Sequence, residues 1–308
     1  VKKGIQFLDV KLSTKKMREV EIVADIAKER ETPVAFTNIS REKLNEELAS
    51  QDIPMVLNST PSVYATQSGG GDGDARITIR GFSQRNLAVM IDGVPVNDME
   101  NGWVYWSNWF GLDMVTQTIQ VQRGLGVSKL AVPSIGGTMN IFTSGIDSKK
   151  QFTVKMEAGS GMFQRQSFSY NSGKMKNGWG FTGAFSRKKG DGVVDGTYTD
   201  GYFFYGKVEK KIKNHLISLS AFGAPQSHGQ RSFKQPISFY NADDARSLGV
   251  SQDAIDQYSL SGGSNHGVKF NQFYGDYIDK NGVKRELNER ENIYFKPQIT
   301  LRDFWQVS

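Results

Sequence analysis

Five aromatic residues crowd into residues 101–112 and form the densest group of side chains that could recognise a ligand. They are Trp103, Tyr105, Trp106, Trp109 and Phe110. Exposed rings stack on sugar faces or flat chelates, and the N–H and O–H groups of Trp and Tyr can orient what they hold. Large rings also pack well in a hydrophobic core. The sequence leaves both roles open for each ring.

Catalytic chemistry finds little support elsewhere. The three histidines, His215, His228 and His266, are far apart in the chain and have no recurring spacing to Ser or to a carboxylate. Residues 124–129, GLGVSK, lack the spacing of a phosphate loop. Residues 279–282, DKNG, are typical of a hairpin turn rather than of a calcium loop. We expect no enzyme activity, no cofactor and no metal site.

The charge of the chain does not indicate a nucleic-acid partner. Its net charge is +6, but the 38 basic residues are spread along the sequence and mixed with 32 acidic ones. A phosphate-binding face needs a cluster or a stripe of basic residues. We therefore expect a solvated surface of mixed charge and no nucleic-acid binding. The absence of cysteine excludes a disulfide framework and a thiolate metal site.

The elements that must position these residues change character along the chain. Ser40 can cap a helix that follows it, and Pro54 can open a second helical turn. Residues 77–143 then contain short apolar strands punctuated by glycine. Segments expected to be loops lie before these strands, at residues 69–74, and between them, at residues 83–86 and 101–112.

From residue 151 onward the chain alternates regularly, and Phe152, Val154 and Met156 share one face of the first strand. We predict about six strands of about nine to eleven residues, the length that crosses a tilted bilayer span. The connections alternate between short (174–178, 212–214) and long (188–200, 224–292). A soluble sandwich also alternates, but a loop as long as residues 224–292 is unusual there, so we favour a membrane barrel. Because bacterial barrels need about eight strands or more, we expect the chain to be a fragment of one.

Residues 17–31 precede these elements and read as an extended, charged segment. Val20 and Ile22 lie on one side, and Glu19, Glu21 and Val23 on the other. Such a segment is either a linker or a peptide that adds as a strand to a partner's sheet.

Four motifs, in this order and spacing, resemble those of the TonB-dependent receptors of Gram-negative outer membranes. They are ITIRG at residues 77–81, AVMIDGVP at 88–95, IQVQRG at 119–124 and IGGTMNI at 135–141. The resemblance implies a mixed α/β plug domain at residues 32–148, followed at 149–308 by the first strands of a large barrel of about 22 strands. Residues 1–16 are similar to the end of the carboxypeptidase-regulatory-like β-sandwich that one subgroup carries before the plug.

The same resemblance implies a partner. The segment Glu19, Val20, Glu21, Ile22, Val23 and Ala24 sits where the family carries its TonB box, the peptide that binds the TonB-type periplasmic energy-coupling protein. The subgroup also implies a possible surface lipoprotein partner. Outer-membrane lipid would surround the barrel, with the plug inside it and the N-terminus in the periplasm.

The resemblance further implies roles within the plug. Its apical loops would face the ligand, with the candidate residues Gln84, Arg85, Trp103, Tyr105, Trp106 and Trp109. Arg80 and Arg123 lie at strand ends beside glycine and would form ion pairs with carboxylates of the barrel wall, since a buried guanidinium must be paired.

The function that follows is active import of a nutrient from outside the cell. The alternative is a plugged structural or secretion-associated barrel of an envelope complex that imports nothing. The sequence does not choose among a glycan, a peptide, a siderophore and a cobalamin as ligand.

Overall fold

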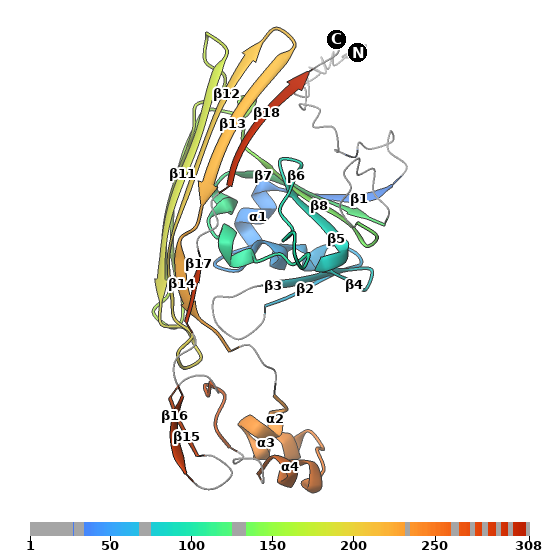
Figure 1. The fold of residues 1–308 in the computed structure, drawn as a ribbon, viewed down its shortest axis with the longest axis vertical. Helices are drawn as coiled ribbons and strands as arrows, with labels where there is room; N and C mark the ends of the chain where they lie inside the picture. The colour runs from blue at the N-terminus through green and yellow to red at the C-terminus, as the bar shows by residue number, and fades with distance from the viewer. Residues whose placement is uncertain are drawn as a thin grey trace, which may run out of the picture.

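A computed structural model describes residues 27, 34–67, 75–124, 134–231, 235–259, 265–271, 275–278, 283–287, 291–294 and 298–305. The predicted regulatory-like segment at 1–16 and the residues Glu19 to Ala24 lie outside these described residues. The chain forms a compact α/β unit held against the concave side of a tall, curved antiparallel sheet (Figure 1). A separate excursion with three short helices lies beyond one end of that sheet.

The compact unit contains two small sheets. The first has the order β1-β7-β8-β5-β6, and its only parallel pair among the described strands is β5 with β8. The second has the order β2-β3-β4. The strands of the first sheet are β1 (Ala35–Ser40), β5 (Leu87–Ile91), β6 (Val94–Pro95), β7 (Thr116–Arg123) and β8 (Gly137–Thr143). Those of the second are β2 (Val63–Gln67), β3 (Ala75–Ile79) and β4 (Phe82–Ser83).

Short helices complete this unit. Ser40 caps α1 (Arg41–Glu47) by accepting a hydrogen bond from the Lys43 amide, as its position in the sequence predicts. Pro54 lies in the first turn of the 3₁₀ helix η1 (Ile53–Ser59), which confirms the predicted second turn. Three more 3₁₀ helices are η2 (Gln84–Asn86), η3 (Trp106–Trp109) and η4 (Leu112–Met114). Leu44, Leu57, Ile77, Ile79 and Leu87 are all buried in one core between the two sheets.

The tall sheet is built mainly from six strands. They are β9 (Gln151–Ala158), β10 (Gln164–Asn171), β11 (Trp179–Gly190), β12 (Thr199–Ile212), β13 (His215–Gly223) and β18 (Gln298–Trp305). Two shorter strands, β14 (Gln226–Gly229) and β17 (Glu291–Tyr294), extend the ladder beside β12. The predicted strand at residues 293–301 is therefore divided between β17 and β18, which pair with β14 and β13 respectively.

The two faces of the tall sheet have opposite chemistry. Phe152, Phe181, Phe185, Phe204 and Leu301 are exposed on its outer face. Polar side chains, among them Ser167, Ser186 and Lys207, are buried on the inner face beside the α/β unit. A sheet with apolar residues on its outer face and polar residues on its inner face has the pattern of a transmembrane β-barrel wall. A soluble sandwich has the reverse pattern. The predicted alternation is thus confirmed, and its direction now shows which face is outward.

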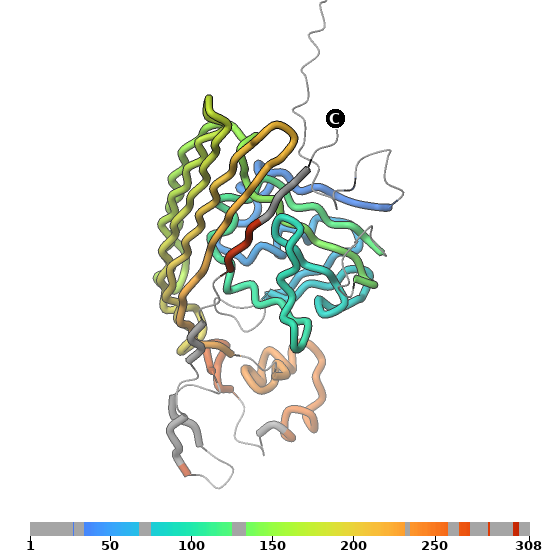
Figure 2. The backbone as a smooth tube through the Cα atoms, turned by 45° about the horizontal axis from the view of Figure 1, so that its top comes forward, coloured from blue at the N-terminus to red at the C-terminus, as the bar shows by residue number. Residues whose placement is uncertain are grey.

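The excursion between β14 and β17 contains helices α2 (Ile237–Tyr240), α3 (Ala242–Ser247) and α4 (Gln252–Ser259) and the hairpin β15 (Gly275–Ile278)–β16 (Lys284–Leu287). The turn predicted at residues 279–282 falls between these two paired strands but lies outside the described residues. Figure 2 shows the excursion at the end of the sheet opposite the β12–β13 turn. Within the described residues, no helix is long and apolar enough to span a membrane.

One glycine is required where β7 and β8 meet. Gly137 has φ +138°, and a Cβ added there would collide with the carbonyl oxygen of Gln122. A Cβ added at Gly206 in β12, by contrast, would have no atom within 4 Å.

We predict that Gly137→Ala lowers the free energy of unfolding of the α/β unit by about 2 kcal/mol or more. Denaturant unfolding followed by tryptophan fluorescence would measure this, and Gly206→Ala is the matched control that should change little.

Candidate functional site

The aromatic run does not form one exposed surface. Trp106 and Trp109 are only 2% and 4% exposed and meet edge to face, with ring centroids 5.7 Å apart. Phe110 packs against Phe203 of β12, with centroids 6.1 Å apart. The run thus supplies core rings and a contact to the sheet, because the 3₁₀ helix η3 turns these side chains inward.

Gln84 is part of the same core. It is 1% exposed, accepts a hydrogen bond from Trp106 Nε1 at 3.3 Å and donates one to the Val104 carbonyl at 3.1 Å. The prediction that Gln84, Trp106 and Trp109 face a ligand is therefore wrong. The polar atoms of Gln84 and of Trp106 fix the loop, and the rings of Trp106 and Trp109 are covered by the core.

Three of the predicted loop residues do reach the surface. Arg85 is exposed, and Trp103 and Tyr105 are half-buried. The guanidinium carbon of Arg85 lies 4.8 Å from the centroid of the Trp103 ring, and that of Arg76, at the start of β3, lies 5.5 Å from it. Arg76, Arg85 and Trp103 lie in, or directly beside, three different segments expected to be loops. They thus meet at the Trp103 ring.

The loop that carries Trp103 is tightly built. Asn97 donates hydrogen bonds to the carbonyls of Leu87 and Gly102, and its Oδ1 accepts one from the Val89 amide. The Asp98 amide donates to the Trp103 carbonyl at 2.8 Å. These bonds fix the loop to β5 at the edge of the core.

Arg80 and Arg123 both make their contacts within the α/β unit. The Arg80 guanidinium lies against Gly124, and Arg123 donates to the Pro61 carbonyl at 3.2 Å. Among the described residues, neither arginine forms an ion pair with a carboxylate of the tall sheet. Their pairing with carboxylates of a barrel wall stays a prediction.

The ion pairs that join the α/β unit to the tall sheet have the opposite polarity from the predicted ones, because the α/β unit supplies the carboxylate and the sheet supplies the cation. Asp113 of η4 lies 2.6 Å from Arg165 of β10 and 3.4 Å from Lys155 of β9, and Glu157 completes the cluster by pairing with both cations. Asp113 and Arg165 are almost fully buried. Burial raises the pKa of the Asp113 carboxyl, but the charges of Arg165 and Lys155 outweigh it, so the net pKa is lowered.

A second cluster lies where the α/β unit passes into the sheet. Lys207 of β12 is 3.4 Å from Asp92 and 3.2 Å from Glu209. Asp92 also accepts hydrogen bonds from the amide and the hydroxyl of Thr143, at 2.7 and 2.6 Å. Glu209 accepts the Ile146 amide at 2.5 Å. The aspartate of the IDG motif thus holds the end of β8 next to a buried lysine of the wall.

These ionic residues escaped the sequence analysis, although a signal was present. Arg165, Lys207 and Glu209 alternate along their strands with the apolar residues of the outer face. A charge at such a position must lie on the inner face and must find a partner there. The partner, however, comes from a distant part of the chain.

A further contact holds the chain just after the predicted TonB box. Gln120 of β7 accepts a hydrogen bond from the Ala27 amide at 2.7 Å and donates one to the Ala27 carbonyl at 3.0 Å. Both residues are buried, and Gln120 also contacts Asn38 and Gln122. We call this two-bond contact the Gln120 clamp.

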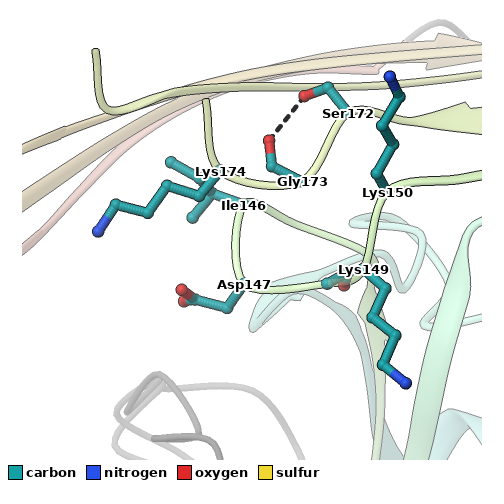
Figure 3. A pocket seen from close by; sticks show the side chains of 8 residues that line it. Ile146, Asp147, Lys149, Lys150, Ser172, Gly173 and Lys174 are labelled. Carbon is teal, nitrogen blue, oxygen red and sulfur yellow. Dashed lines mark hydrogen bonds between the residues drawn. The ribbon is translucent and has the colours of Figure 1, made fainter. Parts of the chain in front are cut away.

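An open pocket of about 480 Å³ lies at the short-turn end of the sheet, lined by residues 146–150 and 172–174. Figure 3 shows that Lys149, Lys150 and Lys174 point in different directions rather than toward a common point. It offers no convergent set of donors for a ligand. In the described part of the chain, no group of three or more His, Asp or Glu side chains is placed to hold a metal ion.

This arrangement, a small α/β unit filling the concave side of an outward-apolar sheet, is that of a plugged β-barrel. Residues 28–138 match the family TonB-dependent Receptor Plug Domain. Residues 28–138 therefore belong to the plug-domain family of TonB-dependent receptors, and strands with the pattern of a β-barrel wall follow them.

Relatives support this assignment. The chain is 27% identical over 153 residues to the Vitamin B12 transporter BtuB of Vibrio vulnificus, covering 48% of this chain and 25% of that protein. It is 25% identical over 129 residues to the Probable TonB-dependent siderophore receptor PirA of Acinetobacter baumannii, covering 38% and 17%. The chain thus spans about a quarter or less of the length of these two relatives.

Solved structures show the same fold. The Ferric-Catecholate import receptor Fiu of E. coli aligns with a TM-score of 0.56 at 17% identity, over 80% of this chain and 34% of that one. The ferric citrate transporter FecA in its unliganded form aligns with a TM-score of 0.53 at 20% identity, over 74% and 36%.

The cluster around Asp113 predicts a defined pH dependence. Because the folded-state pKa is lowered, its contribution to stability is fully present above the unfolded pKa of about 4 and is lost as pH falls through the folded value. We predict that Asp113→Asn lowers the free energy of unfolding by about 3 kcal/mol at pH 7, since it leaves Arg165 with one fewer charge partner. The difference from wild type should shrink on acidification below about pH 4.

Denaturant unfolding between pH 3 and 7 would measure both effects. The matched control is Glu47→Gln, which breaks the exposed pair of Lys43 and Glu47 at 3.8 Å and should cost about 0.5 kcal/mol or less. A loss that is the same at pH 3 and at pH 7 would show that the carboxylate charge is not what matters.

Proposed function

We propose that this chain is the plug and first barrel strands of an active outer-membrane transporter. The receptor binds a nutrient ligand from outside and imports it with energy delivered by a TonB-type periplasmic protein. The barrel is integral to the Gram-negative outer membrane and contacts its lipid through the outer face of the sheet. The N-terminus lies in the periplasm, where the TonB-type protein would reach it.

One observation carries the proposal: a plug that is held by two kinds of contact. Buried ion pairs through Asp92 and Asp113 fix it to the wall. The neutral Gln120 clamp holds the chain three residues after Ala24. A transporter needs a firmly seated plug and a coupling segment that can be released. A purely structural barrel would not need the second.

We assign the TonB box to Glu19, Val20, Glu21, Ile22, Val23 and Ala24. Its binding mode would be strand addition, in which main-chain hydrogen bonds supply affinity and alternating side chains supply register. We further propose that residues 1–16 end a carboxypeptidase-regulatory-like domain and that a surface lipoprotein is a partner of this subgroup. The relatives take different ligands, vitamin B12 and siderophores, so none is carried over to this chain.

Deletion of residues 19–24 should abolish energised uptake while leaving ligand binding at the cell surface intact. A sharper pair of variants is Ile22→Pro, which removes a main-chain donor, and Ile22→Val, which keeps it. We expect uptake to fall at least tenfold in the first and to stay near wild type in the second. The measurement is uptake in cells with and without an uncoupler. Preserved uptake in the deletion variant would refute this assignment.

The Gln120 clamp gives an independent prediction. The chain has no cysteine, so Ala24→Cys introduces a single thiol whose labelling rate reports how accessible the segment is. Gln120→Leu keeps the bulk of the side chain but removes both hydrogen bonds to Ala27, and we expect labelling without ligand to speed up at least threefold. Gln117→Leu on the exposed side of the same strand is the control. Equal rates in all three proteins would show that the clamp does not restrain the segment.

A further inference from the structure

Arg76, Arg85 and Trp103 form a cluster that none of the contacts described so far explains. They come from β3, η2 and the loop before η3, yet both guanidinium carbons lie within 5.5 Å of one indole centroid. The two carbons are therefore at most about 10 Å apart, the sum of their distances to that centroid. A small molecule can bridge a span of this size.

Within the part of the chain that the structure describes, no ion pair balances the positive charge of this cluster. Arg76 and Arg85 are both exposed, and among the described residues neither forms an ion pair with a carboxylate. Asp98 lies in the same loop, but its Oδ1 accepts the amides of Glu100 and Asn101 at 3.0 and 3.2 Å, which fixes the turn. Two cations in one place, without a partner in the described chain, attract an anion.

The cluster is also held ready for binding. A guanidinium stacked on an indole keeps its in-plane N–H donors free, so stacking orients the cation without using its hydrogen bonds. Trp103 is fixed at both ends of its backbone, since its amide donates to Asn101 Oδ1 at 2.7 Å and its carbonyl accepts the Asp98 amide at 2.8 Å. A site fixed in advance loses less entropy when a ligand binds.

We propose that Arg76, Arg85 and Trp103 form a subsite for an organic anion that carries two or more carboxylates. Each arginine fork binds one carboxylate, and Trp103 sets the orientation of both forks. This inference rests on the proposed function, because it places the subsite among the plug loops that meet the imported ligand. It selects an acidic ligand over a neutral glycan.

Calorimetry on the purified receptor with its whole barrel would test this, with citrate as the anionic probe and maltotriose as the neutral one. We expect the wild type to bind citrate and not maltotriose. The affinity should weaken about tenfold in Arg85→Gln and in Arg76→Gln, as for the loss of one charge-assisted hydrogen-bonding group. Arg85→Lys should recover only part of the loss, since it keeps the charge but not the fork.

Trp103→Leu should weaken citrate binding although it removes no charge, which separates orientation from simple attraction. Arg246→Gln, an exposed cation of the distant excursion, is the control and should bind citrate as the wild type does. Binding should also weaken as salt is raised. The absence of citrate binding up to about 10 mM, or equal affinity in the wild type and both arginine variants, would overturn the inference.

The same experiment separates this inference from the proposed function. Energised uptake that needs residues 19–24, in a receptor that does not bind citrate through these arginines, would overturn the subsite alone. Citrate binding through Arg76 and Arg85, with uptake unaffected by that deletion, would overturn the import assignment and leave the subsite standing.

Discussion

The buried charges on the inner face of the barrel strands are the constraint on which the rest of the structure depends. A strand whose outer residues are apolar for lipid must turn its polar residues inward, and Arg165, Lys207 and Glu209 are buried there. A buried charge without a partner is strongly unfavourable. Glu157 and Glu209 of the wall pair with Arg165 and Lys207, and Asp113 and Asp92 of the plug give each cation a second partner. Asp113 and Asp92 in turn have their cations on the wall, so shared ion pairs join plug and wall electrostatically.

This dependence explains why the attachments of the plug differ in chemistry. The contacts at η4 and at the end of β8 are ionic and buried, and removal of one partner leaves a charge that water cannot reach. The contact at Ala27 consists of two neutral hydrogen bonds, whose net contribution is about 1 kcal/mol each. We therefore expect the neutral contact to break first when the chain is pulled at its N-terminal side. The distribution of charge would thus determine that the N-terminal segment detaches before the plug leaves the wall.

The sequence predicts local structure well here because local chemistry determines it. Ser40 caps its helix, Pro54 begins the second turn, and the alternation after residue 151 gives the six long strands. The roles of side chains were harder to predict. Trp106 and Trp109 were expected at a ligand but lie in the core, because a 3₁₀ helix turns them inward. The partners of Arg165 and Lys207 lie 52 and 115 positions away, a distance that no local pattern reports.

The division of the aromatic run also bears on recognition. Trp106, Trp109 and Gln84 form a buried base, and the hydrogen bonds of Gln84 with Trp106 and Val104 hold the loop from which Trp103 emerges. Because Trp106 and Trp109 lie in the core and Tyr105 is half-buried, Trp103 stands beside two arginines rather than within a wide aromatic platform. A wide platform would suit the flat face of a sugar. A single ring that orients two guanidinium groups suits an anion, because the hydrogen-bond donors lie on the arginines and the ring only positions them.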